Sequence, residues 1–220
     1  MEENKLYNMD CLVFMKGLPD KCFDLVLTDP PYGIGASSKN FIRQGKQTGK
    51  SKAVSGLNYE VSEWDNKSPS KEYFDEMIRV SKNQIIFGGN YFVEYLKNSS
   101  CWIVWDKNNG DNLYADCELA WTSFDSAVRK IKYTWHGMIQ ENMKNKDVRF
   151  HPTQKPTEVM KWILDKYSKE GETILDPFMG SGTTCVAAKL LKRNYIGIEI
   201  DKKYCKIAED RIKAISNPLF

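Results

Sequence analysis

One four-residue motif combines the groups that chemistry on a planar amine requires. Asp29-Pro30-Pro31-Tyr32 follows an apolar run, Phe23 to Thr28, that is typical of a buried strand. The two prolines end ladder pairing and stiffen the backbone. The Asp29 carboxylate and the Pro30 carbonyl can then accept hydrogen bonds from an exocyclic amine and localise its lone pair as charge develops. A rigid surface turn is the alternative interpretation.

A glycine-rich turn near the C-terminus indicates a nucleotide-like ligand. The predicted strand Thr173 to Leu175 leads into Asp176-Pro177-Phe178-Met179-Gly180-Ser181-Gly182-Thr183-Thr184, and a helix follows. Glycines let the backbone approach a ligand, and the first helical turn offers free N–H groups. A tight turn without a ligand is the alternative.

Three ligand classes compete for this turn. A P-loop needs a lysine after its last glycine, but Gly182 is followed by Thr183. A dinucleotide fingerprint needs a third glycine where Cys185 stands, and Asp176 would repel a pyrophosphate. S-adenosylmethionine has a cationic sulfonium, an ammonium and no phosphate, so an acidic strand end suits it. Glu199, which ends the next predicted strand, is placed to bind the ribose hydroxyls, with Asp201 as its rival.

The Tyr32 ring adds a surface on which a nucleobase can stack. A base inside a duplex is out of reach, so an enzyme that acts on its amine must extrude it. Methylation at carbon 5 of cytosine needs a cysteine after a proline, and none of the six cysteines follows one. The residues therefore favour direct transfer to an exocyclic nitrogen.

The order of apolar runs predicts a single α/β domain over residues 1–220, with a doubly wound, Rossmann-like sheet. Helices on both faces of a mainly parallel sheet are expected. The predicted strands are Phe23 to Thr28, Gln84 to Phe87, Trp102 to Trp105, Glu118 to Trp121, Thr173 to Leu175 and Tyr195 to Ile198. The predicted helices are Lys71 to Ser81, Tyr91 to Lys97, Thr157 to Tyr167, Thr183 to Leu191 and Lys203 to Ile215.

Composition excludes several classes of protein. Hydrophobic residues make up 41% and charged residues 28%, and no apolar run approaches the roughly 18 residues of a membrane span. The N-terminal residues lack a secretory signal, so a cytoplasmic location is expected. The six cysteines are scattered, with only His136 and His151 to assist them, so neither a metal site nor a disulfide framework is predicted.

Two basic stretches suggest a polyanionic partner beyond the small net charge of +3. The first lies in a long predicted loop, residues 33–66, and the second lies within residues 129–149. Solvated loops are the alternative interpretation of both. Their basic residues are Lys39, Arg43, Lys46, Lys50 and Lys52 in the first stretch, and Arg129, Lys130, Lys132, Lys144, Lys146 and Arg149 in the second.

Together these motifs resemble the DNA amino-methyltransferase family, which makes N6-methyladenine or N4-methylcytosine from S-adenosylmethionine. Asp29 to Tyr32 is similar to its catalytic motif, and Asp176 to Thr184 to its cofactor loop. His151-Pro152-Thr153-Gln154-Lys155-Pro156 is similar to the segment before that loop. The catalytic motif precedes the cofactor loop, as in the family's β subgroup. The resemblance implies a sheet with an antiparallel hairpin strand in the region Trp102 to Trp121.

The resemblance also implies site residues. An aspartate before Pro-Pro-Tyr usually accompanies adenine in this family and a serine cytosine, so N6-adenine is expected; N4-cytosine, or an RNA or protein amine, is the alternative. The implied catalytic residues are Asp29, Pro30, Pro31 and Tyr32. The implied cofactor contacts are Asp10, Cys11, Asp29, His151, Thr153, Lys155, Asp176, Pro177, Phe178, Gly180, Ser181, Gly182, Thr183, Glu199 and Asp201. Capping is the rival role for Asp10.

The expected partner is double-stranded DNA. Target recognition is predicted to use a short segment, residues 125–150, together with the basic loop 33–66, whose cations would hold phosphates. The sequence leaves open whether a second copy of the chain or a cognate restriction nuclease is also a partner. The predicted DNA contacts are Lys39, Arg43, Lys46, Lys50, Lys52, Arg129, Lys130 and Lys132.

Overall fold

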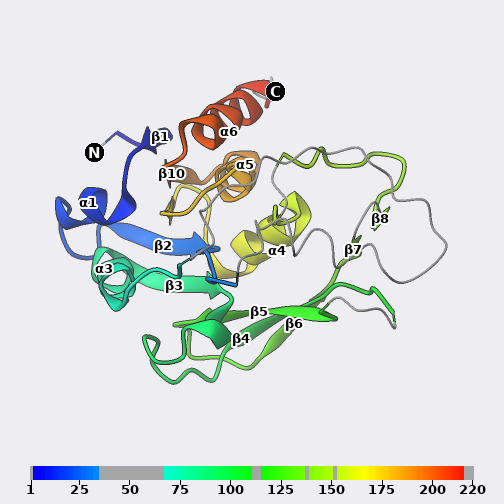
Figure 1. Ribbon diagram of the computed structural model, residues 1–220, viewed down its shortest axis with the longest axis horizontal. Coiled ribbons are helices and arrows are strands. Elements are labelled where there is room, and N and C mark those ends of the chain that lie inside the picture. The colour runs from blue at the N-terminus through cyan, green and yellow to red at the C-terminus, as the bar shows by residue number, and fades with distance from the viewer. Residues whose placement is uncertain (1, 35–66, 111–114, 137–138, 151–152, 216–220) are drawn as a thin grey trace.

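An eight-stranded sheet forms the centre of the molecule (Figure 1), in a computed structural model that describes residues 2–34, 67–110, 115–136, 139–150 and 153–215. The strand order is β1-β10-β9-β2-β3-β5-β4-β6. Only β5 runs against the others, because it pairs antiparallel with β3 and β4 while the remaining neighbours pair parallel. The strands are β1 (Lys5–Asn8), β2 (Phe23–Thr28), β3 (Ser81–Phe87), β4 (Trp102–Asp106), β5 (Cys117–Thr122), β6 (Arg129–Lys132), β9 (Thr173–Asp176) and β10 (Asn194–Glu199).

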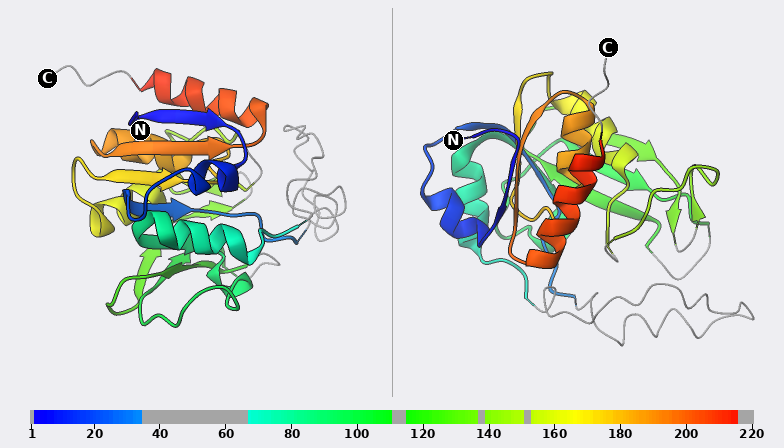
Figure 2. Two further views of the ribbon diagram at one scale, coloured as in Figure 1. Left: turned by 90° about the vertical axis from the view of Figure 1, so that its left-hand side faces the viewer. Right: turned by 90° about the horizontal axis from the view of Figure 1, so that it is seen from above.

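Helices cover both faces of this sheet (Figure 2). One face carries α1 (Cys11–Lys16) and α3 (Lys71–Val80), and the other carries α4 (Thr157–Tyr167), α5 (Thr183–Leu190) and α6 (Lys202–Ala214). From Leu25 to Leu27 the side chains of β2 alternate between two buried clusters: Leu25 and Leu27 pack on the α4–α5 side, and Val26 packs on the α1–α3 side. A strand covered on both faces is buried throughout, which explains its continuous apolar run. The predicted fold class is confirmed.

Most predicted elements are present within a few residues of their expected bounds. The bounds of β2 and α4 match the prediction, and α3 ends at Val80 because β3 begins directly at Ser81. Four strands and one α-helix were not predicted. These are β1, α1, β6 and the two short strands β7 (Trp135–His136) and β8 (Ile139–Gln140).

The predicted helix Tyr91 to Lys97 is wrong. A short 3-10 helix, η1 (Gly89–Tyr91), is followed by a turn instead. Phe92 and Tyr95 both pack on the Phe74 ring, at centroid distances of 4.8 and 5.3 Å. Trp121 Nε1 donates to the Lys97 carbonyl at 2.8 Å and holds the end of this segment. Aromatic residues three positions apart therefore gave the spacing expected of a helix, although the chain forms a turn that these contacts hold in place.

Beyond the sheet, β7 and β8 form a two-stranded arm within the predicted target-recognition segment (Figure 1). The basic loop residues 35–66 lie outside the described residues, and His151 does too. None of the described helices is long and apolar enough to cross a membrane. All six cysteines are free thiols, and the described part of the chain contains no cluster of side chains suited to a metal ion.

Candidate active site

Two loops, the Asp-Pro-Pro-Tyr corner (Asp29 to Tyr32) and the glycine corner (Asp176 to Thr184), lie side by side. Strands β2 and β9 pair in parallel, so their carboxyl ends meet at one edge of the sheet. Thr28 Oγ1, directly before Asp29, donates a buried hydrogen bond of 2.7 Å to Asp176 Oδ1, across 148 positions of sequence. Ligand sites in doubly wound sheets occur at this edge. The two motifs thus share one edge of the sheet. A hydrogen bond joins Thr28, directly before one motif, to Asp176, the first residue of the other.

Both oxygens of the Asp29 carboxylate have partners. The Tyr32 hydroxyl donates to Oδ1 at 2.6 Å, and the Lys155 ammonium forms an ion pair with Oδ2. The Lys155 side chain is 6% exposed and also pairs with Glu118 Oε2 at 3.0 Å. Glu118 pairs in turn with Lys107 at 2.6 Å. Asp29 therefore ends a row of alternating charges at the carboxyl edge of the sheet.

Burial and neighbouring charges determine the protonation states in this row. Burial raises the pKa of the Asp29 carboxyl, Lys155 partly offsets that effect, and Glu118 adds to it. Burial opposes a charged Lys155, but Asp29 and Glu118 outweigh it and raise the Lys155 pKa to about 12. Burial and the Asp29 charge raise the pKa of Tyr32 well above its usual value. Tyr32 is therefore a neutral donor and Lys155 a cation.

The Tyr32 ring is held by aromatic neighbours and a glycine. Tyr91 stacks on it with centroids 4.8 Å apart and an interplanar angle of 17°, and Phe92 meets it edge-on at 6.0 Å. Gly88 has a φ of +65°, and a Cβ there would lie 2.2 Å from the Tyr32 ring. Tyr91 is 50% exposed. The result is a partly exposed aromatic pair beside Asp29.

The glycine loop is tied to the end of β10 by Glu199. Gly180 N–H donates to Glu199 Oε2 at 2.9 Å, and Asp201 N–H donates to Oε1 at 2.8 Å. A Cβ on Gly180 would meet nothing within 4 Å, so this part of the loop faces open space. At Gly182 a Cβ would lie 2.7 Å from the Ala208 Cβ, so that glycine serves helix packing instead.

Two acids at this corner have raised pKa values. Burial raises the pKa of Asp176 to about 6, against the lowering effect of hydrogen bonds from Thr184, Thr28 and the Phe178 N–H. Burial also raises the pKa of Glu199 to about 7, and Asp201 and Asp176 add to the effect. The corner therefore favours a cation, because a positive ligand would stabilise both ionised forms.

Several predicted cofactor contacts have internal partners instead of open surroundings. Ser181 and Thr183 are buried, and Arg211 Nη1 donates to both hydroxyls at 3.1 Å and to the Ser181 carbonyl at 2.6 Å. Ser181 Oγ also donates to Gln154 Oε1 at 3.1 Å. Pro177 is buried as well. These side chains hold the shape of the loop.

Asp10 and Asp201 both cap helices. Asp10 accepts from the Val13 N–H at 3.0 Å at the start of α1 and from the Tyr73 hydroxyl at 3.0 Å. Asp201 accepts from the Lys203 and Tyr204 N–H groups at the start of α6. The capping role weighed for Asp10 is therefore present, and Asp201 also has a capping role, whereas Glu199 holds the glycine loop. Among the other predicted contacts, Cys11 is buried with its pKa raised by burial, Pro30 is buried, and Pro31, Phe178 and Thr153 are half-buried.

Four residues at the site were missed in the sequence. Glu118 and Lys107 extend the charge row, Tyr91 stacks on Tyr32, and Arg211 clamps the glycine loop. One signal was available, because Glu118 is a charged residue at the start of an otherwise apolar strand. The remaining three depend on long-range contacts that leave no local pattern.

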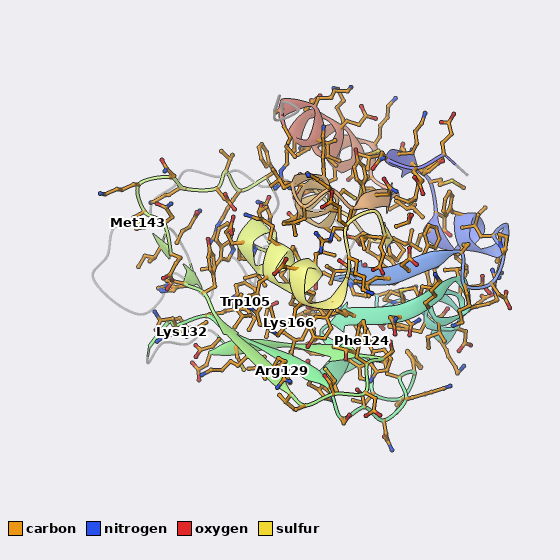
Figure 3. All side chains as sticks on the ribbon, turned by 180° about the vertical axis from the view of Figure 1, so that it is seen from behind. Trp105, Phe124, Arg129, Lys132, Met143 and Lys166 are labelled. Carbon is orange, nitrogen blue, oxygen red and sulfur yellow. The ribbon has the colours of Figure 1, made fainter. Side chains whose placement is uncertain are left out.

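The basic residues of β6 lie at different ends of the strand (Figure 3). Lys132 is paired in register with Asp106, which ends β4 at the carboxyl edge, whereas Arg129 is paired with Ile103 near the start of β4. Arg129 lines a groove of about 580 Å³ with Phe124 and Lys166. Lys130 forms an ion pair with Asp106 at 3.3 Å. Of these three cations, Lys132 is closest to the edge that carries Asp29.

Known proteins match most of this chain. The DNA methylase family model matches residues 105–210. The type II methyltransferase M.HinfI of Haemophilus influenzae is 28% identical, over 98% of this chain and 70% of that protein. M2.DpnII of Streptococcus pneumoniae is 26% identical, over 95% of this chain and 89% of that protein.

A solved structure shows the same fold. The crystal structure of the M1.HpyAVI–SAM complex aligns with a TM-score of 0.56 at 24% identity, over 94% of this chain and 98% of that one. The family model covers the glycine loop and Lys155, and both curated relatives extend over nearly the whole chain. Fold, motif order and sequence matches agree, and over nearly its whole length the chain is similar to DNA amino-methyltransferases.

Proposed function

We propose that this protein transfers a methyl group from S-adenosylmethionine to the exocyclic N6 of adenine in double-stranded DNA, at a base extruded from the helix. The main support for this proposal is one observation: the hydrogen bond between the Thr28 and Asp176 side chains joins the Asp-Pro-Pro-Tyr corner to the glycine corner. Group transfer requires both reactants within reach of each other, and adjacent strand ends provide that geometry.

The residues of the glycine corner fit this cofactor. The open side of Gly180 leaves room for a ligand against the backbone. Asp176 and Glu199 are buried acids with raised pKa values, and the cationic cofactor would compensate their charge. Each Glu199 oxygen accepts one N–H and retains a lone pair for a ribose hydroxyl. Asp10, at the end of the neighbouring β1, is proposed to accept from the adenine amine.

The bound cofactor supplies an electrophilic methyl group on a positively charged sulfur. Asp29 and the Pro30 carbonyl accept the two N–H groups of the target amine and localise its lone pair. The Asp29 oxygens keep free lone pairs beside their bonds to Tyr32 and Lys155. As the nitrogen–carbon bond formed and the methyl–sulfur bond broke, leaving the sulfur as a neutral thioether, the nitrogen would become positive, and its surplus proton would pass to the Asp29 carboxylate. The Tyr32–Tyr91 pair supplies the ring surface for the extruded base.

We assign adenine because an aspartate, Asp29, stands before Pro-Pro-Tyr. Target DNA is proposed to contact the basic loop 33–66 and the segment 125–150 of this single domain. The segment 125–150 exposes Ile139 in β8, and Met143 and Val148 after it. Exposed apolar side chains next to cations suit binding to DNA with an extruded base, because apolar side chains can insert between the bases that remain stacked.

Labelled-methyl transfer tests this function. Purified protein with methyl-labelled S-adenosylmethionine is offered double-stranded DNA, RNA and a protein mixture in parallel, and the product is digested to nucleosides. The expected product is N6-methyladenine from the DNA sample. N4-methylcytosine would overturn the choice of base, and label only in RNA or protein would overturn the choice of substrate.

A further inference from the structure

We propose that Lys155 and Glu118 are positioning residues for Asp29: Lys155 holds it as an ionised carboxylate oriented toward the target amine, and Glu118 holds Lys155 in place. The proposal rests on the proposed function, and it moves Lys155 from the set of cofactor contacts to the support of Asp29. It also adds Glu118, which lies outside all the motifs.

The geometry leaves Lys155 little freedom. Its ammonium lies between Asp29 Oδ2 and Glu118 Oε2 in a side chain that is 6% exposed. The ammonium also lies 5.2 Å from the centroid of the Phe87 ring and 5.8 Å from that of Tyr32. A buried cation needs charged partners because desolvation is costly, and both carboxylates supply them. Lys155 is therefore engaged on the Asp29 side of the site.

Glu118 determines where that cation stays. It lies at the start of β5, which is antiparallel to β3, so it extends past the carboxyl end of β3. Lys107, directly after β4, pairs with the other Glu118 oxygen at 2.6 Å. The strand and the second ion pair thus fix Glu118, and Glu118 fixes Lys155. Without Glu118, Lys155 would be held by Asp29 alone.

The two residues have opposite electrostatic effects on Asp29. Burial raises the pKa of Asp29, Lys155 lowers it, Glu118 raises it, and the Tyr32 hydrogen bond lowers it. Asp176, on the adjacent β9, is the other buried carboxyl that interacts with Asp29. Removing the cation should therefore raise the Asp29 pKa, and removing the Glu118 charge should lower it. A purely structural role for these residues predicts no such opposition.

The first test follows the Asp29 carboxyl directly, without cofactor or DNA. Protein labelled with carboxyl-carbon-13 aspartate is titrated by NMR, and Asp29→Asn identifies the Asp29 signal. The midpoint of that signal should move to higher pH in Lys155→Met and to lower pH in Glu118→Gln. Lys161→Met changes a half-buried lysine on α4 that pairs with the exposed Glu158; it is the matched control and should leave the midpoint unchanged.

The second test follows kcat against pH at saturating substrates. The acid limb should move to higher pH in Lys155→Met, with a loss of about tenfold or more at pH 7, and to lower pH in Glu118→Gln. Lys155→Arg keeps the charge and should restore most of the activity. If Lys155→Met does not fold, Glu118→Gln and Lys155→Arg still carry the test.

The outcomes separate this proposal from the proposed function. Midpoints that do not move, or that move in the same direction in Lys155→Met and Glu118→Gln, would overturn the positioning role. A wild-type protein that methylates no DNA would overturn the function, and the NMR titration would still decide how Lys155 and Glu118 act on Asp29.

Discussion

The Thr28 hydroxyl donates a 2.7 Å hydrogen bond to the Asp176 carboxylate, with both side chains buried between β2 and β9. Thr28 is the last residue before the proposed catalytic motif, and Asp176 is the first of the glycine loop. The bond therefore transmits the position of one motif to the other.

Gly88 should be needed for the position of Tyr32. In Gly88→Ala the new Cβ would lie 2.2 Å from the Tyr32 ring, on a backbone with a φ of +65°. The backbone strain alone should cost about 1–3 kcal/mol of stability. Displacing the ring should lower kcat by about a hundredfold, since small misplacements at a reacting centre are costly. Steady-state methyl transfer and thermal unfolding measure both effects.

Gly110→Ala is the matched control, because Gly110 has a φ of +63° with nothing within 4 Å of a Cβ. It should share the backbone cost and keep wild-type kcat. Equal kcat in the two variants would show that the contact between Gly88 and Tyr32 has no role in turnover.

Substitutions at Glu199 and Asp201 should distinguish a role in cofactor binding from a role in helix capping. Glu199→Ala removes the acceptor of the Gly180 N–H and the proposed ribose contact, so the cofactor Kd should rise by about tenfold or more. Asp201→Ala removes the cap of α6 and should cost about 1 kcal/mol of stability with a nearly unchanged Kd. Calorimetry and denaturation give both numbers. A Kd that responds only to the Asp201 change would transfer the ribose contact to Asp201.

Glu199 should make the ligand-free protein less stable as pH rises. Unfolded glutamates titrate at about pH 4.3, whereas burial raises the folded Glu199 pKa to about 7. The folded state then binds the proton more tightly, so this contribution to stability is complete below about pH 4 and is lost as pH rises through 7. Denaturant unfolding of wild type and Glu199→Gln measures it. The stability difference, wild type minus variant, should fall between pH 4 and 7.5, and a rise would contradict the assignment.

Lys132 should contribute more to DNA binding than Arg129. Lys132 ends β6 at the edge that carries the site, and Arg129 lies at the opposite end of the strand. Lys132→Ala should therefore lower affinity and reduce the slope of log affinity against log salt by about 1. Arg129→Ala should change the slope less. DNA titrations at several salt concentrations decide this, and a larger slope change for Arg129→Ala would reverse the proposed orientation of DNA.

Structural features that depend on a short stretch of sequence were predictable. The apolar run of β2, the proline stop after it and the strand–glycine–helix order around Asp176 each reflect short-range rules, and all three are present. The side-by-side placement of the two motifs was also predictable, because parallel strands bring their carboxyl ends to one edge.

Contacts between distant segments were not predictable. For Asp10, which stays a proposed cofactor contact, the sequence left a capping role open, but the bond from Tyr73 depends on the fold. Lys155 looked like a cofactor contact, and only the fold brings it 126 positions back to Asp29. The edge strand β6 was missed because an exposed strand, Arg129–Lys132, has no apolar alternation to reveal it.

The most direct measurement of the central claim, that the two corners form one methyl-transfer site, compares turnover and cofactor binding in Asp29→Asn. Asp75→Asn, an exposed carboxylate on α3 paired with Lys71, is the control. The account predicts that Asp29→Asn lowers kcat for DNA methylation by about a hundredfold or more, with the cofactor Kd within about threefold of wild type. Wild-type turnover in Asp29→Asn would contradict it.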